Sequence, residues 1–236
     1  MGHRGPFPKE IDMTTDTTAV AECTPAQRVT RSLLGYGVIA GPFYVTVSLA
    51  QALTRDGFDL SRHAWSLLAT GSLGWIQVLN FALSGAMVLA FAVGLRRALS
   101  PGRGSTWAPR LVAGYGTGLL LASIFRADPG FGFPPGTPAD AHDVSWHGML
   151  HLVCASIGFL CLIAACLVVG RRFAADNRPG WALYSRVSGI CFLAGFVGVA
   201  AGAGSRPLTI AFVASVVIVW TWMSLVSVHL YRTTAK

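Results

Sequence analysis

Charged residues are scarce in this chain of 236 residues: 12% are Asp, Glu, Lys or Arg, whereas 53% are hydrophobic. Soluble domains carry roughly 25% charged residues, so about half of the usual charge is missing. Long uncharged segments cause this shortage, which argues against a soluble protein. The first 30 residues also lack an apolar run near their start, and we therefore expect no cleavable signal peptide.

The segments expected outside the membrane contain few cysteines that could form a disulfide. Of the five cysteines, Cys23 lies in the polar N-terminal region. The other four lie within apolar segments: Cys154, Cys161, Cys166 and Cys191. Because no pair is expected outside the membrane, we predict no disulfide and interpret the four as small apolar packing residues.

Six apolar segments dominate the rest of the chain. A membrane-spanning helix needs about 20 mostly apolar residues, and the segments cover residues 33–53, 75–95, 111–125, 149–170, 187–203 and 208–230. The third segment reaches that length only with Trp107 and Ala108. Because a span must satisfy its own backbone hydrogen bonds, we predict an all-α bundle of six transmembrane helices over residues 31–236. Residues 1–30 are predicted to form a disordered tail.

The net charge of +8 follows the expected topology. With six spans, one side carries 14 Lys and Arg residues and the other carries 4, which together make the 18 in the chain. The four are Arg55, Arg62, Arg126 and Arg206. Positive residues favour the cytoplasmic side, so we predict an inner (plasma) membrane protein with both termini in the cytoplasm. The charge indicates contact with membrane lipids and gives no support to a nucleic-acid partner.

The two long loops on the less basic side share a spacing. Arg55 precedes Trp75 by 20 positions, and Arg126 precedes Trp146 by 20 positions. Two helical hairpins of similar plan would explain this pattern, and internal repeats are common in membrane folds. Chance similarity is the alternative.

Most residues that could carry chemistry lie near the second of these loops. His147 and His151 are four residues apart, so a helix would present both imidazoles on one face. Asp128, His142 and Asp143 precede them. The predicted topology brings polar residues of the first hairpin to the same side: Ser48, Gln51, Asp56, Asp59, His63, Gln77 and Asn80.

Paired imidazoles and a carboxylate suit zinc with an open position for water. We therefore predict His147, His151 and Asp128 as metal ligands and Asp128 and His63 as catalytic residues. Other polar residues would line the site: Gln51, Asp56, Gln77, Asn80 and Asp143.

A structural role is the alternative for each of these residues. His151 could bond to Asn80, Gln51 or a carbonyl group, and Asp128 could serve as a turn or cap residue. Gln77 and Asn80 share a helical stripe with Ser84, which favours contacts between helices over contacts with a substrate.

Three stretches resemble a known family. They are GPFYVTVSLAQALTRDGFDLSRHAWSLLATGSLGWIQVLNF, FRADPGFGFPPGTP and HGMLH. Over most of residues 31–230 the chain resembles the bacterial membrane proteins grouped as domain-of-unknown-function family 998. The resemblance implies an integral membrane protein with several helices and implies no particular activity.

A looser likeness concerns chemistry. Membrane hydrolases of the alkaline ceramidase and adiponectin-receptor type use an Asp and a His-x-x-x-His pair at zinc, and Asp128, His147 and His151 are similar. Those proteins have seven helices and carry the histidine pair late in the bundle, whereas this chain shows six and carries the pair at the fourth. Two functions stay open: a metal-dependent hydrolase of a lipid-like amide or ester, or a non-enzymatic carrier, lipid-binding protein or partner subunit. The oligomeric state stays open as well.

Overall fold

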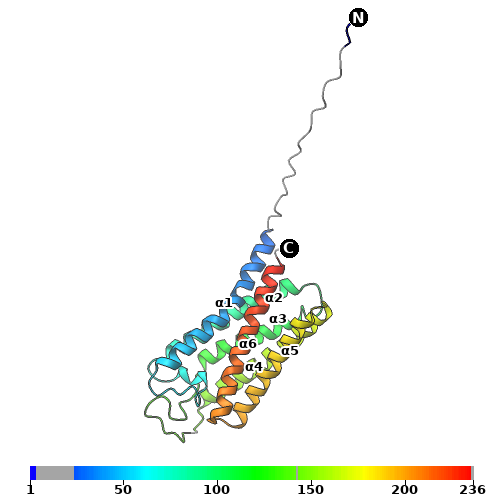
Figure 1. Ribbon diagram of the computed structural model, residues 1–236. Helices are drawn as coiled ribbons and strands as arrows, with labels where there is room; N and C mark the ends of the chain where they lie inside the picture. The colour runs from blue at the N-terminus through cyan, green and yellow to red at the C-terminus, as the bar shows by residue number, and fades with distance from the viewer. Residues whose placement is uncertain (4–23, 142, 235–236) are drawn as a thin grey trace.

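The computed structural model describes residues 1–3, 24–141 and 143–234 as an all-α bundle (Figure 1). The described residues contain no β-sheet, so the predicted all-α class is confirmed. The helices are α1 (Pro25–Thr54), the 3-10 helix η1 (Trp65–Ala69), α2 (Gly74–Leu99), α3 (Trp107–Ile124), α4 (Trp146–Ala175), α5 (Pro179–Ala201) and α6 (Arg206–Thr233).

Helix α1 begins earlier than the sequence predicts. Thr24 and Gln27 form a capping box, in which each side chain bonds to the backbone N–H of the other residue, at 2.8 and 3.3 Å. This cap, followed by Pro25 at the first helical position, starts the helix within the segment expected to be tail. The predicted disorder of residues 4–23 lies outside the described residues.

The six long helices form a closed ring. Each one packs against its neighbours in the chain, and α6 returns to pack against α1. Glycines permit the close approaches: a Cβ on Gly85 of α2 would lie 2.9 Å from the carbonyl oxygen of Gly116 on α3, and a Cβ on Gly118 of α3 would lie 3.1 Å from Cα of Gly158 on α4. Close backbone contact of this kind is typical of helices that associate in a membrane.

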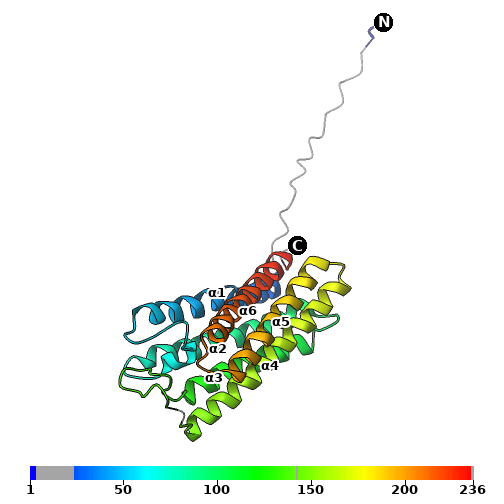
Figure 2. The ribbon, with the colours of Figure 1, turned by 60° about the horizontal axis from the view of Figure 1, so that its bottom comes forward.

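The connections divide the bundle into two ends. The loop end holds residues 55–73 (the first long loop), 125–145 (the second long loop) and 202–205; the terminus end holds the start of α1 and the end of α6 (Figures 1 and 2). The second long loop includes His142, which lies outside the described residues. The first long loop contains the short helix η1.

Five of the six long helices are long and apolar enough to cross a membrane. Helix α3 is the exception: it has 18 residues and opens with Trp107, Pro109 and Arg110, which lower its hydropathy. It nevertheless occupies a full place in the ring between α2 and α4. The chain is therefore a multi-pass membrane protein.

Candidate functional site

A cavity of about 580 Å³ lies inside the ring, towards the loop end. All six long helices contribute to its wall, through Tyr44, Phe81, Tyr115, Phe159, Phe192 and Phe212 among others. Ligand sites in proteins are typically concave, mostly apolar and 300–1,000 Å³ in volume. The cavity is thus large enough for a small molecule or part of a lipid.

Aromatic side chains form two walls of the cavity. On one side, the ring of Tyr44 lies 6.0 Å from Trp65 and 6.1 Å from Phe81, measured between centroids. On the opposite side, Phe159 lies 5.1 Å from Phe192 and 5.9 Å from Phe212. Packed aromatic walls favour an apolar occupant.

A few polar groups line the cavity near the loop end. Arg62, Asp128 and Asp143 contribute charged side chains. Two further lining residues carry a buried polar atom for which the described residues supply no hydrogen-bond partner, Nε1 of Trp65 and Oγ1 of Thr209. The cavity is therefore amphipathic, with its charged groups gathered at one end.

The predicted metal ligands do not converge. His147 is exposed and stacks on Trp146, with 3.6 Å between ring centroids. His151 is buried, and its Nδ1 lies 2.8 Å from the carbonyl oxygen of Phe125. A carbonyl only accepts hydrogen bonds, so Nδ1 donates and Nε2 is left as the acceptor of the ring. His151 lines the cavity and His147 does not.

Asp128 fastens the second long loop to the start of α4. Its Oδ2 accepts from the backbone N–H of Ser145 at 2.8 Å, and its Oδ1 accepts from the Ser145 hydroxyl at 2.6 Å. The same hydroxyl accepts from the N–H of Gly148 at 3.1 Å and caps the helix. A Cβ on Gly148 would collide with the Asp128 carboxylate, so glycine is needed there. A carboxylate at a helix N-terminus is favourable.

We expect Asp128→Ala to destabilise the fold by about 1–2 kcal/mol, because it removes two hydrogen bonds that hold Ser145, the residue whose hydroxyl caps α4. The free energy of unfolding in mixed micelles measures this. Asp56→Ala, which changes an exposed carboxylate of the first long loop, is the control and should alter stability by less than about 0.5 kcal/mol. An Asp128→Ala protein of unchanged stability that had lost bound zinc would contradict the capping role.

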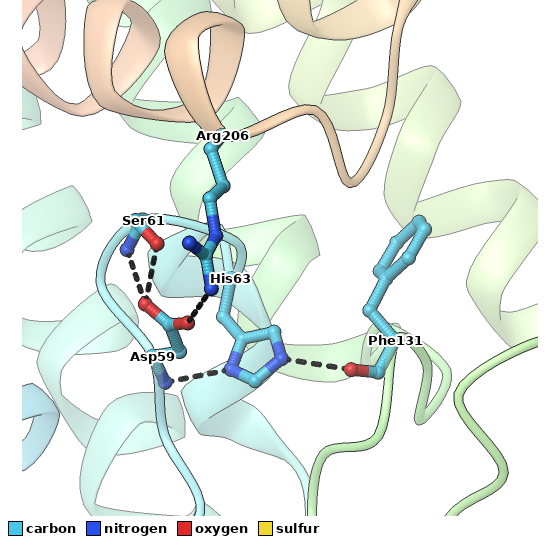
Figure 3. Close-up of polar contacts among 5 residues, drawn as sticks. All are labelled: Asp59, Ser61, His63, Phe131 and Arg206. Carbon is cyan, nitrogen blue, oxygen red and sulfur yellow. Dashed lines mark hydrogen bonds and ion pairs between the residues drawn. The ribbon is translucent and has the colours of Figure 1, made fainter.

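His63 joins the two long loops. Its Nδ1 accepts from the backbone N–H of Asp59 at 2.9 Å, so the ring proton lies on Nε2. Nε2 donates to the carbonyl oxygen of Phe131 at 3.0 Å (Figure 3). Both ring nitrogens are therefore occupied by the backbone, and His63 is a structural link in this arrangement.

Arg55 and Phe133 complete this link. Phe133 is fully buried, and the Arg55 guanidinium carbon lies 4.8 Å from its ring centroid. Arg55 also donates to the carbonyl oxygens of Leu68 at 2.6 Å and Thr70 at 2.7 Å. Burial lowers the pKa of Arg55, which stays charged at neutral pH. We call Arg55, His63 and the turn of residues 130–133 the loop latch.

Asp59 shapes the segment that carries His63. Its Oδ1 accepts from the backbone N–H and the hydroxyl of Ser61 at 2.8 and 2.6 Å, and these bonds lower the pKa of the carboxyl group. Its Oδ2 lies 3.9 Å from Arg206 at the start of α6, an exposed ion pair (Figure 3). Asp59 thus stabilises the turn before His63 and also contacts the start of α6, next to the connection of residues 202–205.

The predicted polar lining residues of α1 and α2 form a buried network between these helices. Gln51 Nε2 donates to Gln77 Oε1 at 2.8 Å, and Asn80 Nδ2 donates to Ser48 Oγ at 3.1 Å. None of these side chains is among those that line the cavity. Their placement matches the alternative of contacts between helices. Asp56 is exposed, whereas Asp143 lies at the edge of the cavity.

The site differs from the predicted one in both chemistry and position. Across residues 1–3, 24–141 and 143–234, no three His, Cys, Asp or Glu side chains form a group that could hold a metal ion. The described residues therefore do not fit the zinc site, whose assignment stays a prediction. The aromatic walls were not predictable, because an aromatic residue within an apolar span does not reveal which way it faces.

Comparison with known proteins gives a family and no activity. No curated protein and no solved structure matches the chain. One family model, described as a protein of unknown function (DUF998), matches residues 38–229, from within α1 to the last turns of α6. The match thus spans the whole ring, both long loops and the cavity. The chain belongs to the DUF998 family of proteins of unknown function.

Proposed function

We propose that this protein binds a lipid-like apolar chain in the cavity inside its helical ring. One observation carries the proposal: all six long helices contribute to the wall of a cavity of about 580 Å³, and aromatic side chains form much of that wall. An apolar chain gains free energy by leaving water or by filling a void between packed side chains. The charged groups at the loop end would face the polar part of the ligand.

The test is the lipid content of the protein purified in mild detergent, measured by native mass spectrometry. Ala155 lines the cavity on α4, and we expect Ala155→Phe to fill part of the space and remove the bound lipid. Ala86→Phe adds the same bulk at an exposed position on α2 outside the cavity, and it should keep the lipid. Equal lipid content in all three proteins would contradict binding in the cavity.

We also propose that all six long helices cross a bacterial inner membrane, with both termini in the cytoplasm. The division of basic residues, 14 against 4 of the 18, supports this orientation. At about 1.5 Å per residue, the 18 residues of α3 extend roughly 27 Å, close to the hydrocarbon thickness of a bilayer. A crossing by α3 leaves the two long loops on the same side.

Cysteine labelling in intact cells tests this topology. In a background without the native cysteines, we expect a membrane-impermeant maleimide to label Asp56→Cys and Thr137→Cys in the two long loops. Ser105→Cys, in the connection between α2 and α3, should react only after the cells are permeabilised. Labelling of Ser105→Cys and Thr137→Cys under the same conditions would show that α3 does not cross.

The competing proposal is a metal-dependent hydrolase of a lipid-like amide or ester. It requires His147, His151 and Asp128 to converge, whereas each is engaged elsewhere: with Trp146, the Phe125 carbonyl and Ser145 respectively. Bound zinc that is lost in a folded His147→Ala/His151→Ala variant would favour the hydrolase. The cavity geometry favours binding of a lipid chain.

A further inference from the structure

We propose that the ligand is an acyl chain of a bilayer lipid, which enters the cavity sideways between the loop-end halves of α4 and α5. This inference rests on the proposed function and specifies the source and route of the ligand. Three features of the molecule support it: the position of the exposed helical residues that line the cavity, the unequal lengths of α4 and α5, and the charged, partly covered loop end.

Among the helical residues that line the cavity, the exposed ones lie on α4 and α5. Leu152 on α4 lines the cavity and is 55% exposed, and Ala200 at the end of α5 is also both lining and exposed. Around the rest of the ring, lining residues such as Tyr44, Phe81 and Phe212 are buried. The helical part of the wall is therefore open between α4 and α5 and closed by packed side chains around the rest of the ring. Outside the helices, three residues of the second long loop also line the cavity and are exposed: Pro129, Asp143 and Val144.

The lengths of these helices explain the opening. They form a hairpin from the terminus end, and α4 has 30 residues whereas α5 has 23. Helix α4 therefore projects past α5 at the loop end by about 10 Å, at 1.5 Å per residue. Their tight contacts lie nearer the terminus end, where a Cβ on Gly189 would be 2.9 Å from Cβ of Cys166. The end of α5 and the connection after it carry small residues, and two of these line the cavity, Ala200 and Ala203.

The loop latch covers part of the loop end. Phe131 is held through its carbonyl oxygen by His63, and its ring points towards the connection between α5 and α6 (Figure 3). There a Cβ on Gly204 would lie only 2.8 Å from Phe131 Cδ1, so ring and backbone are in close contact. An acyl chain arriving from water at the loop end would have to pass the charged side chains of Arg62, Asp128 and Asp143, whereas the gap between α4 and α5 faces the bilayer.

The experiment follows exchange of the bound lipid in nanodiscs made with deuterium-labelled phospholipid, using native mass spectrometry at timed intervals. Ala200→Trp places a bulky side chain at the proposed opening. Ala194→Trp places it at an exposed position on the same helix outside the cavity, as the matched control. His63→Ala loosens the loop latch without touching the opening.

We expect the parent, Ala194→Trp and His63→Ala proteins to exchange at similar rates, and Ala200→Trp to exchange about tenfold more slowly, a barrier increase near 1.4 kcal/mol. Unchanged exchange in Ala200→Trp together with faster exchange in His63→Ala would overturn the lateral route and leave lipid binding intact. Absence of bound lipid from the parent and from Ala194→Trp would overturn the proposed function itself.

Discussion

Replacing Phe133 by alanine should destabilise the protein by about 3–5 kcal/mol, the usual cost of removing a fully buried phenyl ring. Phe133 has no exposed surface and lies between the two long loops, where its ring meets Arg55 at 4.8 Å and Phe58 edge-on at 5.0 Å. Its removal leaves a cavity beside the half-buried guanidinium group of Arg55. Equilibrium unfolding in mixed micelles measures the loss of stability.

Two controls separate the loop latch from a general effect of losing an aromatic residue. Trp75→Ala removes a side chain that is 60% exposed, and its effect should stay near 0.5 kcal/mol or below. Limited digestion by trypsin reports on the first long loop, because Arg62 immediately precedes His63. Trypsin should cleave the Phe133→Ala protein after Arg62 faster than it cleaves the parent. Equal cleavage rates and equal stability would show that the structure of the two long loops does not depend on this ring.

Replacing Gln77 by leucine should cost about 2 kcal/mol, because it leaves buried polar partners without their bonds. Gln77 is fully buried. Its Oε1 accepts from Gln51 Nε2 at 2.8 Å and from Asn80 Nδ2 at 3.2 Å, and its Nε2 donates to Ser48 Oγ at 3.1 Å. The same unfolding measurement applies. A single bond between membrane helices contributes about 0.6 kcal/mol on average, and Gln77 joins several.

Ser84→Ala is the graded control for this network. Ser84 lies at the edge of the network. Among the side-chain to side-chain hydrogen bonds of the described residues, it makes one, donating to Asn80 Oδ1 at 3.3 Å. The loss of its hydroxyl should therefore cost well under 1 kcal/mol. Both variants should keep their bound lipid, since neither side chain lines the cavity. Lost lipid with unchanged stability in Gln77→Leu would make Gln77 a ligand-binding residue instead.

The helices were largely predictable from the sequence, because long uncharged apolar segments have few alternatives to a helix in a membrane. Segment ends were less predictable. Residues 25–30 are polar and lie outside the apolar segment, yet the capping box of Thr24 and Gln27 makes them helical. Helix α3 was the least predictable of the spans, since its apolar segment is short and Arg110 lies in its first turn.

The candidate site was only partly predictable. Placing both long loops on one side brought His63 near the second loop, and the structure joins them through the Phe131 carbonyl. A carbonyl group was one of the partners considered for His151, and the structure confirms it. Which residue supplies that carbonyl, or the one that His63 meets, has no signature in a sequence. The hydrogen bond between Asp128 and Ser145 likewise depends on three-dimensional structure, because the Asp128 carboxylate fits against Gly148 only where that residue has no Cβ.

An experimental density map of the protein in lipid nanodiscs tests lipid binding most directly. We expect continuous elongated density inside the ring between Phe81 and Phe159, extending to the gap beside Leu152 and Ala200. A water-filled cavity, or a compact metal peak bridging His147 and His151, would contradict the binding of an acyl chain.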